Sequence, residues 1–363
     1  MDLHIQYSTP VKTDICVAFC FFNPCGYVRP LQNLTFFEHK LRLAKIPYYS
    51  IEMVIGDKPP MVANPTVRVK SKSSLFYKEA LWNRLEREIP PKYTKIAFID
   101  SDVIFSEANW LDKLSTLLDS CDLVHPFETV DRLDLSYKKV DTLISSLKNN
   151  NTSGSGMGWA ITRECFRKIN GFFENGILGN GDTLFYDCIR ENINENDNQY
   201  LLIKDSFMAY RSNFMKVSPT VTYLDMHIFH LSHGTIKNRQ YGSRHTEILG
   251  KINATWDTLF SVNSDGFWEL NDDSLDKKMI DYFTSRKEDS QEVDKIEDES
   301  KKLPVTVATI MNTPRPAFIQ QIPIQNKPNI PLVNRPQNIP RPQVPSLAPR
   351  VLIARTNSLK RGF

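Results

Sequence analysis

The sequence predicts an α/β fold, with a mixed, mostly parallel sheet flanked by helices. One observation points to this class, and a second shows that the chain is able to bury a core. Short apolar runs with strand character alternate with longer segments whose apolar residues recur at helical spacing. The 363 residues are 41% hydrophobic and 11% aromatic, which is enough to bury a sizeable core. Strands that alternate with helices pair mostly in parallel and are covered by those helices.

Strands and helices are expected to alternate over the first third of the chain. The strands are apolar runs at 14–22, 48–56, 95–100 and 121–127. The helices have apolar residues at helical spacing, at 34–45, 73–90 and 108–118. The second helix is the clearest, since Ser73 or Ser74 can cap its start and Pro90 follows its end.

A glycine-rich region follows at 154–189, "GSGMGWAITRECFRKINGFFENGILGNGDTLFYDCI". Its first glycines precede a short strand and indicate a flexible or closely approached backbone. "TRECFRKI" is expected to form a short helix that Asn170 and Gly171 end with a left-handed cap. The turn "LGNGD" then delivers Asp182 to the start of another helix, where it is either an N-cap or a functional acid.

The composition divides the chain into three parts. Residues 1–285 form the folded domain, and 286–303 are densely charged, as in a linker or a solvated helix. Residues 304–363 hold 11 of the 22 prolines and no Asp or Glu, which predicts a disordered, basic, proline-rich tail. A tail of this kind either binds an acidic surface or an SH3-like groove, or is solvated without a specific partner; the second alternative is favoured.

Charge, cysteines and the N-terminus exclude several classes. A net charge of +3 gives no reason to expect a nucleic-acid partner. The six cysteines are scattered without a CxxC pair, which favours a reduced, intracellular protein without a zinc site. The first residues lack the basic and apolar regions of a signal peptide, and no early apolar run reaches the ~20 residues of a membrane-spanning helix. We therefore expect no transmembrane segment and a cytoplasmic location, the host cytoplasm if the protein is viral.

The stretch "KIAFIDSDVIF" at 95–105 ends a buried strand in two carboxylates, Asp100 and Asp102. Ligands of open parallel sheets lie outside the carboxyl ends of the strands. In an extended segment residues i and i+2 point the same way, and two adjacent carboxylates repel unless a cation lies near them. Mn²⁺ or Mg²⁺ resolves this conflict and also binds a diphosphate. The alternative is that Asp100 caps a turn and Asp102 is solvated.

Taken together, these motifs resemble a nucleotide-sugar glycosyltransferase of the GT-A fold. "RECFRKINGF" is similar to a segment of β-1,4-galactosyltransferases, over a likeness that spans roughly residues 13–270. In that family the segment leads into a Trp-Gly-Trp-Gly-Gly-Glu-Asp-Asp run. This chain instead has "ILGNGDTLF", with no tryptophan and one acid, so only Asp182 is similar to the catalytic base of the family.

The segment "YLDMHIFHLSHGTIKNRQY" carries a second part of the resemblance. In galactosyltransferases a Met-x-x-His pair completes the metal site, and His230 and His233 occupy the matching places. Residues i and i+3 of an extended chain face opposite ways, so both bind a metal only if the segment turns between them. The alternative for either is a core histidine. Lys237, Arg239 and Arg244 follow, where they would screen a diphosphate or simply be solvated.

Further positions resemble nucleotide or donor contacts of GT-A enzymes, each with a structural alternative. Asn23 follows the first strand, Glu52 lies in the second, and Lys78 and Asn83 lie on the helix that precedes "KIAFID". For these the alternative is a strand or helix residue that contacts no ligand. Trp159 either stacks on a sugar or packs in the core.

The resemblance implies a metal-dependent transfer of sugar from a nucleotide-diphosphate sugar, UDP-sugar favoured, to a hydroxyl of a glycan, protein or small molecule. Asp102 and His233, with His230, would hold Mn²⁺ or Mg²⁺. Asp100 would bind the ribose or a metal-bound water. Asp182 would deprotonate the acceptor if the enzyme inverts, the outcome that the resemblance favours.

Two rival functions stay open at this point. "FIDSDVI" and "GDTLFYD" also fit a phosphatase of the haloacid-dehalogenase type, with Asp100 as nucleophile and Asp182 and Asp187 at a Mg²⁺. The lack of further acids after Gly181 also permits a sugar- or nucleotide-binding protein that has lost turnover.

Overall fold

A computed structural model describes residue 3 and residues 5–292. The chain divides into two units, 1–299 and 300–363, and the described residues all belong to the first. The prediction for residues 304–363 and most of that for 286–303 lie outside the described residues.

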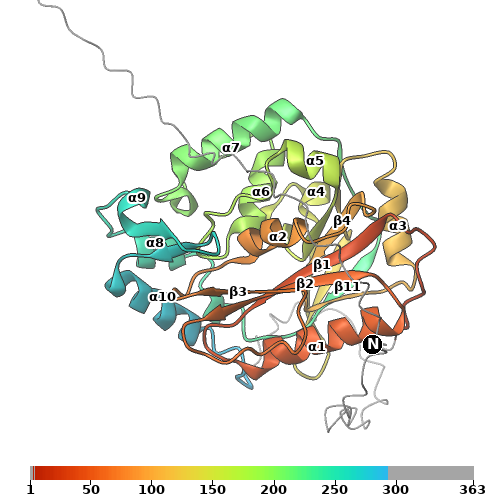
Figure 1. Ribbon diagram of the computed structural model, residues 1–363, viewed down its shortest axis with the longest axis horizontal. Coiled ribbons are helices and arrows are strands. Elements are labelled where there is room, and N and C mark those ends of the chain that lie inside the picture. The colour runs from red at the N-terminus through yellow and green to blue at the C-terminus, as the bar shows by residue number, and fades with distance from the viewer. Residues whose placement is uncertain (1–2, 4, 293–363) are drawn as a thin grey trace, which may run out of the picture. The chain divides into compact units, whose positions relative to one another are not determined.

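A mixed, mostly parallel sheet forms the centre of the described part, as the alternation of elements predicts (Figure 1). Its strand order is β10-β6-β9-β4-β1-β2-β3, and only β9 runs against its neighbours. The strands are β1 (Ile15–Phe22), β2 (Tyr48–Ile55), β3 (Val67–Ser71), β4 (Lys95–Ile99), β6 (Leu123–His125), β9 (Gly158–Thr162) and β10 (Val221–Tyr223).

Helices cover both faces of this sheet (Figure 1). α1 (Val28–Leu43) and α3 (Trp110–Leu117) pack on the face that receives Val17 and Phe19 of β1. α2 (Lys78–Glu86) packs on the opposite face, against Cys16 and Ala18, in a cluster that also takes in parts of α5 (Arg163–Lys168), α6 (Gly181–Ile189) and α7 (Lys204–Val217). β1 thus sends successive side chains to two separate cores, as a strand buried on both faces must.

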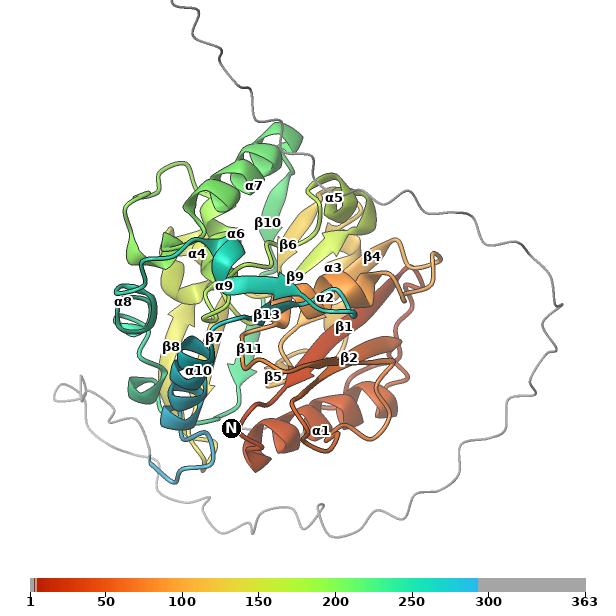
Figure 2. The ribbon, with the colours of Figure 1, turned by 60° about the vertical axis from the view of Figure 1, so that its left-hand side comes forward.

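A second sheet joins the carboxyl end of β4 (Figure 2). Its order is β5-β11-β7-β8, with β5 (Val103–Phe105), β11 (His227–His230), β7 (Thr129–Leu133) and β8 (Lys139–Ile144). β5 follows β4 after three residues and pairs antiparallel with β11, with His230 opposite Val103. This pairing brings residues about 130 positions apart in the sequence together beside the carboxyl end of β4.

The remaining elements are short, apart from the last helix. They are α4 (Ser146–Asn149), α8 (Arg244–Leu249), α9 (Trp256–Leu259), the hairpin β12 (Phe260–Val262) and β13 (Trp268–Leu270), α10 (Asp273–Ser285), and the 3-10 turns Thr152–Gly154, Asn198–Tyr200 and Lys237–Arg239. Among the described residues, no helix is long and apolar enough to cross a membrane.

Two predicted helix starts are wrong. α1 begins at Val28 rather than at 34, because Pro30 lies in its first turn, where the missing N–H costs nothing. α2 begins at Lys78 rather than at 73, and neither Ser73 nor Ser74 caps it. The Ser73 hydroxyl instead accepts from the amide of Leu270 at 2.8 Å. The left-handed cap predicted after α5 is confirmed, with φ of 66° at Asn170 and 74° at Gly171.

Candidate active site

The two aspartates after β4 point into different surroundings. β4 ends at Ile99, and the chain turns, with the amide of Val103 donating to the carbonyl of Asp100 at 3.3 Å. Because the segment is a turn rather than an extended strand, residues i and i+2 no longer share a direction. The expectation that the Asp100 and Asp102 side chains point the same way is therefore corrected.

Asp102 lies against both predicted histidines. Its Oδ2 is 3.0 Å from Nε2 of His233 and 3.5 Å from Nε2 of His230. All three side chains are mostly buried, with exposed fractions of 18%, 13% and 8% for Asp102, His233 and His230. The three residues form a group whose potential ligand atoms lie within 4.8 Å of one another. The three residues that the sequence predicts as metal ligands therefore lie together. One comes from the turn between β4 and β5, and the other two come from the end of β11 and the loop after it.

Both histidines reach Asp102 because the chain leaves the strand conformation after β11. His230 is the last residue of the strand, and the amide of Leu231 donates to the carbonyl of Asp102 at 2.8 Å. Gly234 follows with φ of +89°, a conformation that side chains other than glycine rarely adopt. The chain leaves the strand after His230 and bends at Gly234, and both imidazoles face the same carboxylate.

This cluster fits a divalent cation. Oδ1 of Asp102 is buried and has no hydrogen-bond partner among the described residues, an unfavourable state for a carboxylate oxygen that a cation would relieve. Two imidazole nitrogens and one carboxylate suit Mn²⁺ and other transition metals better than Mg²⁺, which prefers oxygen ligands. Three protein ligands leave coordination positions for a bound substrate.

The electrostatics of the cluster also favour a positive charge. Burial opposes ionisation of Asp102, but His230 and His233 outweigh it and hold its pKa well below the usual range. Burial lowers the pKa of His230, which keeps its imidazole neutral and able to bind a metal. Burial and Arg239 lower the pKa of His233, but its hydrogen bonds to Asp102 and Glu288 outweigh them and raise it.

Asp100 belongs to a second cluster, built around Lys78. Nζ of Lys78, from the first turn of α2, lies 3.3 Å from Oδ1 of Asp100 and 2.5 Å from Oδ2 of Asp182. The ammonium also lies 5.0 Å from the ring centroid of Trp82. Lys78 therefore bridges the two aspartates that the sequence predicts to bind donor and acceptor. The sequence could place Lys78 near the donor but not between these carboxylates.

Burial and like charge shape the pKa values of this second cluster. Burial raises the pKa of Asp100 to about 6, with Lys78 opposing and Asp182 and Asp102 adding to the rise. Burial likewise raises the pKa of the neighbouring Glu79 to about 8, again against Lys78. For Lys78, burial opposes its charge, but the three carboxylates outweigh it and raise its pKa well above the usual range. The cluster is thus one fixed cation among several acids.

Glycines let the backbone approach this second cluster. The amide of Asp100 donates to the carbonyl of Met157 at 3.1 Å, next to Gly158. Gly158 has φ of +137°, and a Cβ there would lie 2.4 Å from the carbonyl oxygen of Phe98. A Cβ on Gly181 would lie 2.0 Å from the carboxylate of Glu79. Both predicted glycine-rich turns therefore make close contacts, the first with the backbone of β4 and the second with Glu79.

Comparisons with known proteins add two distant likenesses. No protein-family model matches the chain, and no curated protein matches it by sequence. Among similar solved structures, a mutant form of β1,4-galactosyltransferase 7 from Drosophila, in complex with manganese, UDP-Gal and xylobiose, is 12% identical with a TM-score of 0.35, covering 74% of this chain and 99% of that one. The A197 protein from STIV is 12% identical with a TM-score of 0.29, covering 72% and 95%. Both TM-scores are low, so these likenesses carry no argument about function.

Asn23 and Glu52 have partners within the protein. The side chain of Asn23 donates to the carbonyl of Tyr27 at 2.7 Å and accepts from the amide of Tyr27 at 3.0 Å. Glu52 is 2% exposed, and its carboxylate accepts from two backbone amides and from Nε of Arg68 at 2.8 Å. These bonds hold loops near β1 and β2, and a nucleotide contact for either residue stays a prediction.

Trp159 and Asn83 make contacts within the protein that give each of them a structural role. Trp159 is 1% exposed, and its ring packs against His125 and Phe185, so the tryptophan is a core residue rather than a platform for a sugar. The amide of Asn83 donates to the carbonyl of Phe172 and to Glu174, both at 2.7 Å. It thereby fixes the turn that follows α5.

Basic side chains gather beside the histidines, as the sequence predicts in part. Nη2 of Arg239 lies 2.9 Å from Nε2 of His233, and Nη1 donates to the hydroxyl of Tyr241 at 3.1 Å. The guanidinium of Arg244 lies 4.8 Å from the ring centroid of Tyr241. Desolvation of the Tyr241 hydroxyl opposes its ionisation although the residue as a whole is 51% exposed, but Arg239, Arg286 and Arg244 outweigh this and lower its pKa to about 8. Arg286 follows α10 and was missed, because its surroundings read as a linker.

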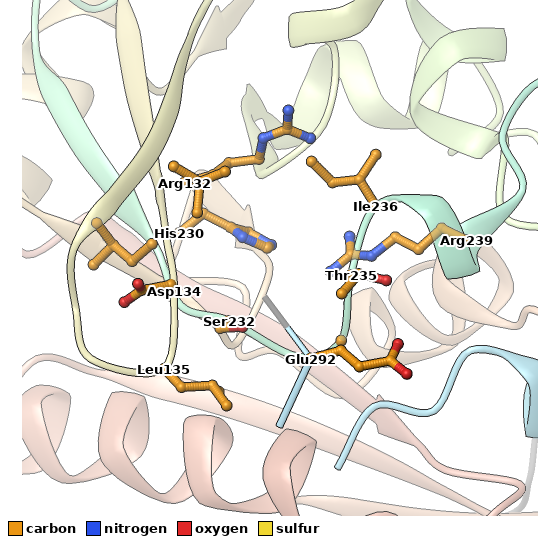
Figure 3. Close-up of a pocket in the computed structure, with 12 residues that line it drawn as sticks. Arg132, Asp134, Leu135, His230, Ser232, Thr235, Ile236, Arg239 and Glu292 are labelled. Carbon is orange, nitrogen blue, oxygen red and sulfur yellow. The ribbon is translucent and has the colours of Figure 1, made fainter. Parts of the chain in front are cut away.

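A small cavity adjoins these residues (Figure 3). Figure 3 shows His230 and Arg239 on its walls, with Arg132 from β7 and Thr235 from the loop after β11. His230 and Arg239 thus border both the cavity and the Asp102 cluster. Lys237 lies in the 3-10 turn of this loop and is exposed.

The arrangement counts against the phosphatase alternative. That function needs Asp187 beside Asp182 at a metal. Asp187 is instead fully buried, accepts from the hydroxyl of Tyr200 at 2.5 Å, and pairs with Arg190 at 2.6 Å. Its carboxylate therefore serves the packing of α6 and not the cluster of Asp100.

Proposed function

We propose that this chain is a metal-dependent glycosyltransferase of the GT-A type. It would move a sugar from a nucleotide-diphosphate sugar, with a UDP-sugar favoured, to a hydroxyl acceptor, with inversion at the anomeric carbon. One observation carries the proposal. Asp102, His230 and His233 converge at the carboxyl end of β4, next to the Asp100–Lys78–Asp182 cluster. The sequence resemblance to galactosyltransferases supports the same assignment.

Asp102, His230 and His233 would hold Mn²⁺ or a related divalent cation. When bound, the cation would neutralise charge on the leaving diphosphate as a Lewis acid. Arg239 lies 2.9 Å from His233 and borders the cavity, so its guanidinium is placed to bind phosphate oxygens in a bidentate way. Mn²⁺ is the better candidate than Mg²⁺ because two of the three ligands are imidazoles.

Asp182 would take the proton from the acceptor hydroxyl while the oxygen attacks the anomeric carbon. The bond from that carbon to the phosphate oxygen breaks, and its electron pair leaves with the nucleoside diphosphate. Lys78 orients Asp182 from α2 at 2.5 Å and keeps a second partner in Asp100 at 3.3 Å. When Asp182 becomes neutral, the ammonium therefore stays paired with Asp100. Asp100 would also bind the donor ribose.

A donor screen tests the proposal. The full chain is incubated with UDP-, GDP- and CMP-sugars, with Mn²⁺ or with EDTA, in the presence of a panel of sugar and peptide acceptors, and release of free nucleotide is followed. We expect Mn²⁺-dependent release from one donor class, lost in Asp102→Asn. Glu164→Gln is the control, since this carboxylate is 78% exposed and pairs with Lys168 on α5.

Calorimetry with the same donors separates the alternatives. Binding of a nucleotide sugar without release, with every acceptor tried, would replace the transferase by a binding protein of the same fold. Absence of both binding and release would overturn the proposal. Release that persists unchanged in EDTA would overturn its metal-dependent part.

A further inference from the structure

Glu288 lies on the far side of the His233 ring from Asp102. Its Oε1 is 3.3 Å from Nδ1 of His233, while Oδ2 of Asp102 is 3.0 Å from Nε2 of the same ring. The side chain of Glu288 is 11% exposed. It comes from the segment directly after α10, which the sequence assigns to a linker.

A buried arginine fixes this carboxylate. Nε and Nη2 of Arg286 lie 2.7 Å and 2.5 Å from Oε1 of Glu288. The guanidinium of Arg286 lies 5.1 Å from the ring centroid of Phe76, which limits its freedom further. The position of the Glu288 carboxylate is therefore fixed by Arg286 as well as by His233.

The backbone of residues 286–289 is clamped on two sides. A Cβ on Gly234 would lie 2.9 Å from the carbonyl oxygen of Arg286, so the loop after His233 touches this segment closely. On the other side, the carboxylate of Asp289 accepts from the amides of Val28 and Arg29, each at 2.8 Å, and caps the N-terminus of α1. The segment thus ties the histidine loop to the start of the domain.

This geometry decides which nitrogen of His233 carries the lone pair that a cation would need. A carboxylate at Nδ1 favours a proton on that nitrogen, because an N–H donates and a carboxylate accepts. The lone pair is then on Nε2, which faces Asp102 and accepts from Nη2 of Arg239 at 2.9 Å, so a cation bound at Nε2 would take the place of the guanidinium there. Carboxylates placed in this way orient metal-binding imidazoles and raise their basicity.

We propose that Glu288 is a positioning residue for His233, and that residues 286–289 belong to the metal centre. The inference rests on the metal centre of the proposed function and not on its donor or acceptor. It predicts that loss of the Glu288 carboxylate weakens Mn²⁺ binding without removing a ligand. It also predicts that Mn²⁺ and the docking of residues 286–289 favour each other.

Direct Mn²⁺ binding to the full chain tests the first prediction, with free Mn²⁺ counted by electron paramagnetic resonance. We expect Glu288→Gln to weaken binding about 10- to 100-fold, the usual cost of losing such a partner. Glu164→Gln changes the net charge equally at an exposed site and should bind as the wild type does. The double variant R286M/E288Q removes both partners of the buried ion pair, so it leaves no unpaired charge if the single variant folds poorly. Its Mn²⁺ binding should be weakened as much as that of Glu288→Gln.

The outcomes separate this inference from the proposed function. Wild-type protein that binds no Mn²⁺ would overturn the metal centre and this inference with it. Wild-type binding with equal affinity in Glu288→Gln and R286M/E288Q, measured where both are folded, would overturn the inference alone and leave Glu288 a partner of Arg286 only.

Hydrogen exchange tests the coupling. Amides of a peptide covering residues 286–292 should exchange more slowly when Mn²⁺ is added to the wild type, and should not change in Asp102→Asn. Slowing of equal size in Asp102→Asn, or none in a wild type that binds Mn²⁺, would contradict the coupling.

Discussion

Asp100 and Asp102 are one residue apart, yet they belong to different clusters. Asp102 lies against the imidazoles of His230 and His233, which come from much later in the sequence. Asp100 meets the ammonium of Lys78, which also binds Asp182. The turn after β4 separates them, since the amide of Val103 bonds to the carbonyl of Asp100.

The difference shows how one strand end can supply two functions. On the Asp102 side the carboxylate is kept ionised, with a buried oxygen that has no partner in the part of the chain that the structure describes, as a cation site requires. On the Asp100 side burial and like charge raise the pKa of Asp100 and Glu79, around a lysine that stays charged. The first cluster is suited to hold a cation and the second to handle a proton.

The largest expected effect is on turnover, and it should appear in the Asp100 cluster without a change in Mn²⁺ binding. Asp182→Asn removes the proposed base and should lower turnover by about 10²- to 10⁴-fold. Its Mn²⁺ affinity should not change, because Asp182 lies on the Asp100 side. Turnover with the best donor of the screen and Mn²⁺ binding are measured on the same sample. Unchanged turnover would remove Asp182 from the mechanism.

The next effect concerns stability. Lys78→Met leaves Asp100, Asp182 and Glu79 without their shared cation, and we expect the free energy of unfolding to fall by about 3–5 kcal/mol. Urea denaturation at pH 7 measures it. Lys168→Met is the control, since its pair with Glu164 is mostly exposed and should be worth less than about 1 kcal/mol. Equal losses in the two variants would mean that Lys78 is not the centre of a buried cluster.

The last effect is a change in how the free energy of unfolding varies with pH, by a smaller amount within any one pH unit. Because the pKa of Glu79 is raised from 4.5 to about 8, the folded chain keeps a proton there that the unfolded chain releases. The free energy of unfolding should therefore fall as pH rises from 4.5 towards 8, by up to about 1.4 kcal/mol per pH unit from this group.

Denaturation at several pH values, compared between variants, tests this slope. Glu79→Gln carries no such proton and should lose that part of the slope, whereas Glu164→Gln should keep it. A slope that is the same in the wild type and in Glu79→Gln would show that Glu79 ionises normally in the folded chain.

The central parallel strands were predictable from the sequence. β1, β2 and β4 lie within one residue of their predicted bounds, because strands buried on both faces read as continuous apolar runs. β3, with the sequence "VRVKS", was missed because charged residues alternate with its buried ones at the sheet edge. The start of α2 was placed too early because Ser73 and Ser74 bond to Leu270 and Asp276, residues 197 and 202 positions away.

The residues of the candidate site were more predictable than their partners. Aspartates at a strand end and histidines after a late strand are unusual enough to be singled out, and Asp102, His230 and His233 do converge. The turn that separates Asp100 from Asp102 leaves no such signal in "DSDV". Glu288 could not be found, because a charged stretch after the last helix looks the same whether it is solvated or docked.

The most direct test of the account is a Mn²⁺ titration of two variants one residue apart. Free Mn²⁺ is measured with wild-type protein, Asp100→Asn and Asp102→Asn, all checked for folding by circular dichroism. We predict that Asp102→Asn weakens binding by more than about 100-fold, beyond the usual cost of losing an outer partner, while Asp100→Asn stays within about tenfold of the wild type. Equal weakening in both variants, or none in either, would contradict the division of this strand end into a cation site and a proton site.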